Sequence, residues 1–441
     1  MTSKQIRTEL PGPIARKLLE RDAQVVAPVP ARVYPLVVER GRGAEVWDVD
    51  GNRFIDFVAG IAVASTGHSH PKVVEAIKAA ADKFLHISCD FYHETQVQLA
   101  ERLGRLAPLS EPAMSFLTNS GTEAIEGALK MARVVTGRPR FIGFYGGFHG
   151  RSMGSLSFTA SKPVQQKGVF PTMPGVTHVP YPNPYRPLFA GEDQGLAVLN
   201  YIENVVFQSN VPPDEVAAIL VEPIQGEGGY LIPPPSFLPG LRELCDRYGI
   251  LLIVDEVQSG VGRTGKMFAV EHSGVQPDVI CMAKGLGSGM PIGSITARRS
   301  LMEKWPYNTH GSTYGGNPLC CAAALATLDL VEEAYLENAR QMGDYLLENL
   351  RALQRKHPVI GDARGQGLMI GLELVEDRLN KKPAKAFASK MIQQAYRQGL
   401  LLLPCGQSTL RLSPPLMIDQ AIIEEGLVIL DQAFSEVEKT M

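Results

Sequence analysis

One stretch decides the fold class: Gly249–Gly260, with the sequence GILLIVDEVQSG, in which an uninterrupted apolar run ends in polar residues and glycine. Two further segments share this design, VAAILVEPIQGEGG at 216–229 and PDVICMAKGLG at 277–287. Continuous apolar runs of this length are typical of strands buried on both faces, as in parallel sheets. A helical pattern at 234–249 lies between the apolar runs that begin at residues 216 and 249. We therefore predict an α/β fold with a mostly parallel central sheet and helices on both faces.

The overall composition is that of an ordinary globular protein. Of the 441 residues, 45% are hydrophobic and 20% are charged. With 43 basic and 46 acidic residues, the formal net charge is −3, which gives no electrostatic reason to expect nucleic acid or a membrane surface as partner. No apolar run approaches the ~20 residues that span a bilayer, and the N-terminal sequence lacks the apolar core of a secretion signal. We expect a cytoplasmic protein.

The cysteines and histidines give no sign of a metal site or of disulfides. The six cysteines form no CxxC pair, and most of them lie in apolar runs, so we expect buried, reduced thiols. His68 and His70 lack the spacing and the flanking cysteines of a zinc site. No metal is expected.

Shorter patterns outline the rest of the chain. A helix is expected near Ile14–Asp22, and Asp50-Gly51 is the turn of a hairpin. A long helical pattern over 317–358 precedes an expected strand pair at 359–375. The Pro- and Gly-rich segment 181–195 is typical of a surface loop.

Lys284 and Asp255 each follow an apolar run, and parallel sheets bind ligands beyond such strand ends. A lysine held in apolar surroundings has a lowered pKa and becomes a nucleophilic amine, although it can also extend its ammonium group to water. Asp255 is either a structural cap or an anion facing a cationic heterocycle. The second reading fits a pyridoxal phosphate site, where a lysine binds the aldehyde and an aspartate keeps the pyridine nitrogen protonated.

Two further motifs add an anion site and an aromatic. In TNSGTEA (Thr118–Ala124), small residues and the following helix can bind a phosphate, although Ser120 and Glu123 also fit a plain capping box. In GGFHGRS (Gly146–Ser152), Phe148 can stack on a flat cofactor and Arg151 can hold a carboxylate. The alternative is an aromatic in the core and an arginine in water.

These motifs occur in the order NSGTEA, GFHGR, EPIQGEGG with VDEVQSGVGRTG, MAKGLGSGMPIG and THGSTYGGNPLCCAAA. In this order they resemble the class III pyridoxal-phosphate-dependent aminotransferases of fold type I, from about Tyr34 to Met417. The resemblance implies a large pyridoxal-phosphate-binding domain at 66–325. It also implies a smaller α+β lobe from the N-terminal segment 1–65 and the C-terminal segment 326–441.

The resemblance assigns roles by position. Lys284 binds the cofactor aldehyde and then acts as general acid and base, and Asp255 pairs with the pyridinium nitrogen. The other implied cofactor contacts are Ser120, Gly121 and Thr122 to the phosphate, Phe148 and His149 at the ring, Gln258 at the 3′-oxygen, Glu222 near the aspartate, and Thr313 to the phosphate of the neighbouring subunit. A homodimer with shared active sites is implied, with pairing into tetramers left open.

Within the class, the chain is most similar to the 4-aminobutyrate group. Ile61 falls at a substrate-lining position, and Arg151 matches the arginine that binds the far carboxylate of an ω-amino acid. Arg411 matches the arginine for the α-carboxylate of glutamate or 2-oxoglutarate, and Glu227 matches the glutamate that pairs with it when that carboxylate is absent. The implied activity is transfer of an amino group from 4-aminobutyrate to 2-oxoglutarate, which gives succinic semialdehyde and glutamate. Acetylornithine or ornithine aminotransferases share these positions, and some relatives are amino-acid racemases or epimerases, so both alternatives stay open.

Overall fold

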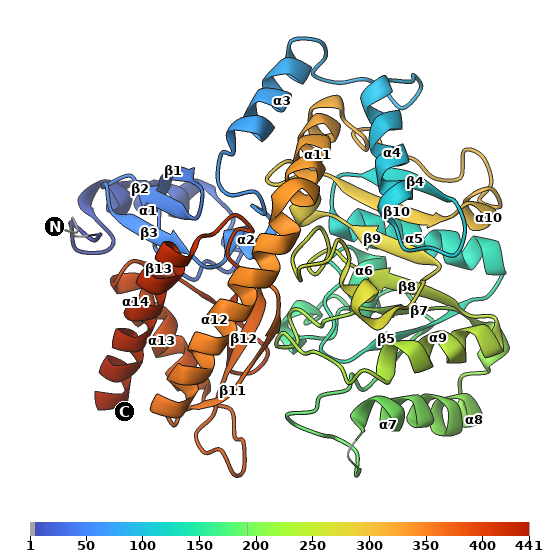
Figure 1. Cartoon of the computed structure of the whole chain (residues 1–441). Coiled ribbons are helices and arrows are strands. Elements are labelled where there is room, and N and C mark those ends of the chain that lie inside the picture. The colour runs from blue at the N-terminus through green and yellow to red at the C-terminus, as the bar shows by residue number, and fades with distance from the viewer. Residues whose placement is uncertain (1–4, 192, 441) are drawn as a thin grey trace.

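The structure, a computed structural model, describes residues 5–191 and 193–440. Its centre is a seven-stranded sheet in the order β4-β10-β9-β8-β7-β5-β6 (Figure 1). The strands are β4 (Ala113–Thr118), β5 (Arg140–Phe144), β6 (Val176–Val179), β7 (Val216–Val221), β8 (Leu251–Asp255), β9 (Val279–Met282) and β10 (Gly293–Arg298). Only β10 runs antiparallel to its neighbours; every other adjacent pair is parallel. The predicted mostly parallel sheet is confirmed.

Both faces of this sheet are covered by helices. Ile253 points into the same buried cluster as Ile125 and Leu129 of α5 (Gly121–Thr136). Its neighbours Leu252 and Val254 belong to a second cluster that contains residues of α9 (Phe237–Tyr248). Because successive side chains of a strand point to opposite faces, an apolar run such as that of β8 needs cover on both sides.

Helix α5 begins and ends at the signals present in the sequence. The Oγ of Ser120 accepts the backbone N–H of Glu123 at 3.3 Å. The Glu123 carboxylate, however, accepts the N–H of Asn119 rather than that of Ser120. Only the half of the expected capping box that involves the Ser120 side chain is therefore present. Gly137 ends the helix with a φ of 69°, a left-handed conformation that favours glycine.

The smaller lobe contains two four-stranded sheets. Their orders are β1-β2-β3-β13 and β11-β12-β15-β14. The strands are β1 (Val38–Arg42), β2 (Glu45–Asp48), β3 (Arg53–Asp56), β11 (Ile360–Gln366), β12 (Met369–Leu374), β13 (Leu400–Leu401), β14 (Leu403–Cys405) and β15 (Thr409–Leu412). The parallel pairing of β13 with β3 joins the two ends of the chain in one lobe (Figure 1). The limits drawn at residues 65 and 325 stay a prediction.

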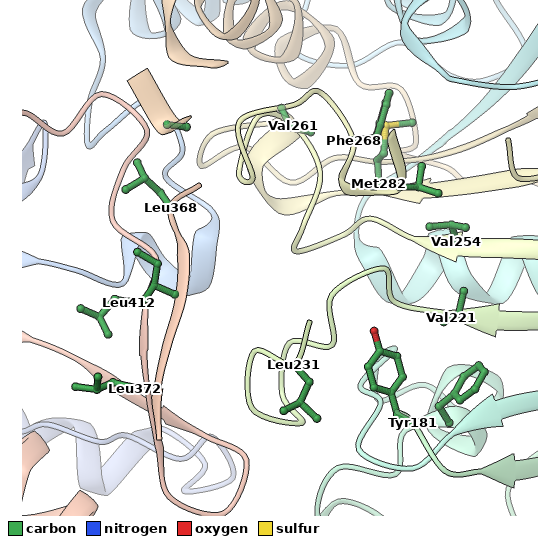
Figure 2. Close-up of a cluster of buried hydrophobic side chains, with 14 of the residues drawn as sticks. Tyr181, Val221, Leu231, Val254, Val261, Phe268, Met282, Leu368, Leu372 and Leu412 are labelled. Atoms are coloured by element: carbon green, nitrogen blue, oxygen red, sulfur yellow. The ribbon is translucent and has the colours of Figure 1, made fainter. Parts of the chain in front are cut away.

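A long helical segment runs between the central sheet and the smaller lobe (Figure 1). It consists of α11 (Pro318–Leu330), the π-helical turn η6 (Val331–Tyr335) and α12 (Leu336–Lys356). The main hydrophobic core continues across this boundary. Figure 2 shows Val254 and Met282 of the central sheet on one side, and Leu372 and Leu412 of the smaller lobe on the other.

The remaining helices include α1 (Pro13–Val25), α3 (Pro71–Ala81), α4 (Glu94–Leu106), α6 (Met153–Phe158), α7 (Gln194–Tyr201), α13 (Lys385–Arg397) and α14 (Gln420–Lys439). The expected helix near residue 14, the Asp50-Gly51 hairpin and the strand pair β11–β12 are all present. Five of the six free cysteines are buried, and Cys89 is exposed. Within 5–191 and 193–440, no helix is long and apolar enough to cross a membrane, and no group of side chains could hold a metal ion.

Candidate active site

The carboxyl ends of the central strands surround a cavity of about 410 Å³. Asp255 ends β8, Lys284 follows β9, Glu222 follows β7, and Ser120 lies between β4 and α5. Ten of the predicted site residues line this cavity: Ser120, Gly121, Thr122, Phe148, His149, Arg151, Glu222, Asp255, Gln258 and Lys284. The parallel topology thus brings together motifs that are far apart in the sequence.

Lys284 presents a free amine to this cavity. Among the described residues, no hydrogen bond or ion pair engages its Nζ. Burial lowers the pKa of Lys284, and the charge of Arg411 lowers it further, while Asp255 opposes both effects. The residue has a φ of 43°, in the left-handed region that side chains rarely adopt. A strained lysine with a lowered pKa at a strand end is suited to act as a nucleophile and as a general base.

Asp255 is held in place on both of its oxygens. Oδ1 accepts the N–H of Val257 at 2.9 Å, and Oδ2 accepts a hydrogen bond from Nδ1 of His149 at 2.7 Å. Burial acts to lower the pKa of His149, but the bond to Asp255 and its charge raise the pKa above the usual value. The carboxylate of Asp255 thus favours the protonated form of His149.

Glu222 lies beside this pair and completes a buried acidic cluster. Its two oxygens accept the N–H groups of Phe148 at 3.1 Å and Gly226 at 2.7 Å. Burial raises the pKa of Glu222 to about 7, and the neighbouring Asp255 adds to the shift. Glu222 thus fixes the backbone of two cavity loops, and the neighbouring His149 acts to lower the pKa of Glu222 against the effect of burial.

Part of the cavity lining comes from the N-terminal end of α5. Ser120, Gly121 and Thr122 belong to it, so backbone N–H groups and the positive end of the helix point toward the cavity. Thr122 also bonds the hydroxyls of Ser152 and Ser155 at 2.7 and 2.6 Å. Gly150 allows this approach, because a Cβ there would lie 2.2 Å from the Thr122 hydroxyl. This end is built for an anion such as a phosphate.

Aromatic and amide groups form the side walls. Phe148 lines the cavity, and the guanidinium of the exposed Arg151 lies 5.8 Å from its ring centre. The Oε1 of Gln258 accepts the hydroxyl of Tyr230 at 2.8 Å, which leaves the Gln258 amide nitrogen as a donor. The walls therefore offer a flat apolar surface, a cation at the rim and an amide donor.

Arg411 and Glu227 form an ion pair that lies beyond the lining residues but within electrostatic reach of Lys284. The Nη2 of Arg411 lies 2.6 Å from Oε1 of Glu227 and also donates to the carbonyl of Pro404 at 3.0 Å. The Nε and Nη1 of Arg411 are buried and have no hydrogen-bond partner among residues 5–191 and 193–440. Such unsatisfied donors are costly, and a carboxylate with two oxygens could satisfy them.

The comparisons with known proteins agree with this geometry. A sequence profile described as aminotransferase class-III matches residues 26–434. The chain belongs to the class III aminotransferases. The 4-aminobutyrate aminotransferase of Escherichia coli (strain K12) is 39% identical over 96% of this chain and 99% of that protein. An alanine/serine racemase of Pyrococcus horikoshii is 39% identical over 99% of this chain and 94% of that protein. An acetylornithine aminotransferase of Methanopyrus kandleri is 43% identical over 91% of this chain and 94% of that protein.

A solved structure extends the likeness to the cofactor. An amine transaminase from an uncultivated Pseudomonas species, in its PLP-bound form, is 34% identical with a TM-score of 0.86, over 93% of this chain and 98% of that chain. Class III aminotransferases use pyridoxal 5′-phosphate, and the cavity fits it. The free amine of Lys284, the carboxylate of Asp255 and the N-terminus of α5 match its aldehyde, pyridine nitrogen and phosphate in chemistry.

Besides Glu227 and Arg411, two further predicted residues of this aminotransferase lie away from the cavity lining. Thr313 is exposed, on the loop before α11, and Ile61 is partly buried against the cluster of Val46 and Phe54. Ile61 belongs to a turn, Ala59–Ala62, whose four residues all have a φ between 49° and 64°. The carboxylate of Asp56 supports this strained turn by accepting the N–H groups of Val58 and Ala59.

Several residues of the site were not predicted. Val63 and Asn119 line the cavity, although Asn119 belongs to the TNSGTEA motif, and Lys162 lies 3.5 Å from the carboxylate of Glu227. The segment around Lys162, TASKPVQQ, has no glycine cluster or strand end that would mark it. Only the folded arrangement brings this lysine to Glu227.

Proposed function

We propose that this class III aminotransferase transfers an amino group from an ω-amino acid of the 4-aminobutyrate type to 2-oxoglutarate. The observation that carries this proposal is the Glu227–Arg411 pair with its two unpaired guanidinium nitrogens. An ω-amino acid has no carboxylate next to the reacting carbon, whereas 2-oxoglutarate has one. Glu227 neutralises Arg411 for the first substrate, and the α-carboxylate of the second takes the free donors.

Pyridoxal phosphate supplies an aldehyde that takes up the amino group and a ring that withdraws electrons from the carbon bearing it. The residues of the chain do the rest. Lys284 would hold that aldehyde in the resting enzyme, and its amine, once free, is placed to take the proton from the substrate carbon that bears the amino group. Asp255, held by His149, keeps a negative charge at the pyridine end of the site.

The remaining roles follow from position. Ser120, Gly121 and Thr122 would hold the phosphate, Phe148 would face the ring, and Gln258 would offer its amide donor to the 3′-oxygen. Arg151 at the rim takes the far carboxylate of the substrate, and Ile61 shapes the substrate side. Lysine, aspartate and helix N-terminus then act on three different parts of one cofactor, which fixes its orientation.

We propose further that the enzyme is a cytoplasmic homodimer in which Thr313 reaches the partner's phosphate site. The support is a set of exposed, large apolar side chains in the segments 84–92 and 307–314: Phe84, Leu85, Phe91, Tyr92, Tyr307 and Tyr314. Its two segments touch, since the rings of His86 and Tyr314 lie 5.1 Å apart. Large exposed apolar surfaces mark interfaces, and Thr313 belongs to this one. Light scattering of the holoenzyme should give twice the chain mass.

Two other functions have a specific observation in their favour. The alanine/serine racemase is as similar as the 4-aminobutyrate enzyme, and a racemase would return the proton to Cα on the opposite face. The acetylornithine aminotransferase is also similar. N-acetylornithine reacts at its ω-amine, because its α-amine is acetylated, so this donor also brings no carboxylate next to the reacting carbon. The Glu227–Arg411 pair favours an ω-amine donor over a racemase substrate, because a substrate that always brings an α-carboxylate next to the reacting carbon needs no replacement for it. The choice between 4-aminobutyrate and N-acetylornithine is left to the product assay.

A product assay separates the three. Holoenzyme with 2-oxoglutarate is given 4-aminobutyrate, N-acetylornithine, ornithine or alanine in heavy water. The proposal predicts glutamate and succinic semialdehyde from 4-aminobutyrate. Loss of optical rotation of alanine with deuterium at Cα, and without an oxo acid product, would contradict it in favour of a racemase. Glutamate formed from N-acetylornithine or ornithine alone would contradict it in favour of that donor class.

A further inference from the structure

Glu227 has a second cationic partner that the pairing with Arg411 does not require. Its Oε1 lies 2.6 Å from Arg411 Nη2, and its Oε2 accepts a hydrogen bond from the Nζ of Lys162 at 3.5 Å. Each oxygen of one carboxylate therefore faces a different cation. Burial acts to raise the pKa of Glu227, but the charges of Arg411 and Lys162 outweigh it and lower the pKa below the usual value. Glu227 is a stable anion between two cations.

The two cations differ in their freedom to move. The Arg411 side chain is 5% exposed and is tied to the carbonyl of Pro404, whereas the Lys162 side chain is 39% exposed. Lys162 opens the short 3₁₀ helix η1 (Pro163–Gln165) on a partly exposed loop. When Glu227 leaves Arg411, it can follow the mobile lysine toward solvent, while Arg411 stays where a substrate needs it.

We infer that Lys162 is a positioning residue that holds Glu227 away from Arg411 while an α-carboxylate occupies the arginine. This inference rests on the proposed function and adds the device that makes its second half-reaction favourable. Without Lys162, displacing Glu227 would leave a largely buried carboxylate with no partner, which is costly. When Lys162 is present, the Glu227 carboxylate that leaves the buried Arg411 keeps a cationic partner in the more exposed Lys162.

The inference predicts effects of opposite kind for the two substrates. Loss of the Lys162 charge should weaken binding of 2-oxoglutarate, because opening Arg411 becomes harder. It should leave 4-aminobutyrate binding unchanged or slightly tighter, because Glu227 then stays on Arg411. Because the ion pair is partly exposed, its loss should change the Kd of 2-oxoglutarate by about threefold to fivefold.

The test compares Lys162→Met with Lys167→Met in the holoenzyme. Lys167 is an exposed lysine on the same loop, and no described residue pairs with it. Each half-reaction is followed in single turnovers by cofactor absorbance, which gives a rate and an apparent Kd for 4-aminobutyrate and for 2-oxoglutarate. Lys162→Met should raise the Kd of 2-oxoglutarate about threefold to fivefold with little change in the maximal rate, and Lys167→Met should change neither.

A second variant tells positioning from direct binding. In a Glu227→Gln background there is no anion to hold, so adding Lys162→Met should have no further effect on 2-oxoglutarate. An equal loss with and without Glu227, or a loss for 4-aminobutyrate as large as for 2-oxoglutarate, would overturn the inference in favour of direct carboxylate binding. A wild-type enzyme that transfers normally while Lys162→Met behaves like Lys167→Met would overturn only the inference. A wild type that converts neither substrate would overturn both proposals.

Discussion

Two buried ion pairs lie near Lys284, and they differ in how completely they are satisfied. Both oxygens of Asp255 have partners on the protein, and the His149 that binds it is itself enclosed. Arg411 instead keeps two buried nitrogens that have no partner in the part of the chain that the structure describes, and its Glu227 also contacts Lys162. The His149–Asp255 pair is therefore fixed in one arrangement. Glu227, in contrast, has two cationic partners, Arg411 and Lys162.

This difference matches the task of each pair. A group that stabilises charge during every turnover works best when it is fixed in advance, because no reorganisation is needed. A group that must accept two kinds of substrate needs an alternative partner for each state. The unsatisfied nitrogens of Arg411 therefore indicate a place where a ligand completes the structure.

The largest effect on turnover is expected from Lys284→Ala, which removes the amine near which both ion pairs lie. Turnover should fall at least about 10³-fold, since the nucleophile and the general base are lost together. The cofactor should remain bound through the α5 N-terminus and Asp255. Turnover and cofactor content after dialysis are compared with those of Lys17→Ala, an exposed lysine of α1. A colourless variant without cofactor would contradict the assignment of the other contacts.

Asp255→Asn tests the fixed pair. Losing one preorganised charge at the pyridine end should cost about 3–4 kcal/mol, or roughly 10²- to 10³-fold in kcat for both half-reactions. Asp214→Asn, at an exposed aspartate without a described partner, is the matched control. Near-wild-type turnover of Asp255→Asn would rule out this role.

Glu227→Gln tests the pair that can change partners. It removes the competitor for Arg411, so 2-oxoglutarate should bind more tightly, while the 4-aminobutyrate half-reaction should slow because Arg411 is left unpaired. The ratio of the two specificity constants should shift by about tenfold, equivalent to about 1.4 kcal/mol. Stopped-flow measurement of each half-reaction gives the ratio directly. A parallel change in both would show that Glu227 has only a structural role.

The pH dependence of cofactor uptake reports on Lys284 itself. Burial lowers the pKa of Lys284, so its amine becomes neutral, and hence nucleophilic, at a lower pH than a free lysine. The rate at which apoenzyme takes up pyridoxal phosphate should rise with pH and level off below the range in which free lysine titrates. Absorbance stopped-flow over a pH series, with free lysine as reference, provides the measurement. Identical profiles would contradict the lowered pKa.

The sheet and much of the cavity were predictable because their signals are local. The apolar run before Asp255 had to be a buried strand, and in a parallel sheet its end lies beside the end that carries Lys284. Gly137 and the Asp50-Gly51 turn are likewise local signals.

The parts that escaped prediction depend on contacts distant in sequence. Lys162 meets Glu227 across 65 residues, and His149 meets Asp255 across 106. The left-handed turn at Ala59–Ala62 runs against the preference of Ile61, so surrounding contacts such as those of Asp56 must enforce it. No local pattern contains these arrangements.

The central claim is that Arg411 serves one substrate and Asp255 serves both. The most direct test is Arg411→Ala, with each half-reaction measured separately by single-turnover absorbance in the holoenzyme. The account predicts that the 2-oxoglutarate half-reaction loses about 10²-fold or more in specificity constant, as truncation of a buried, charged binding group does, while the 4-aminobutyrate half-reaction changes much less. Equal losses in both half-reactions would contradict it.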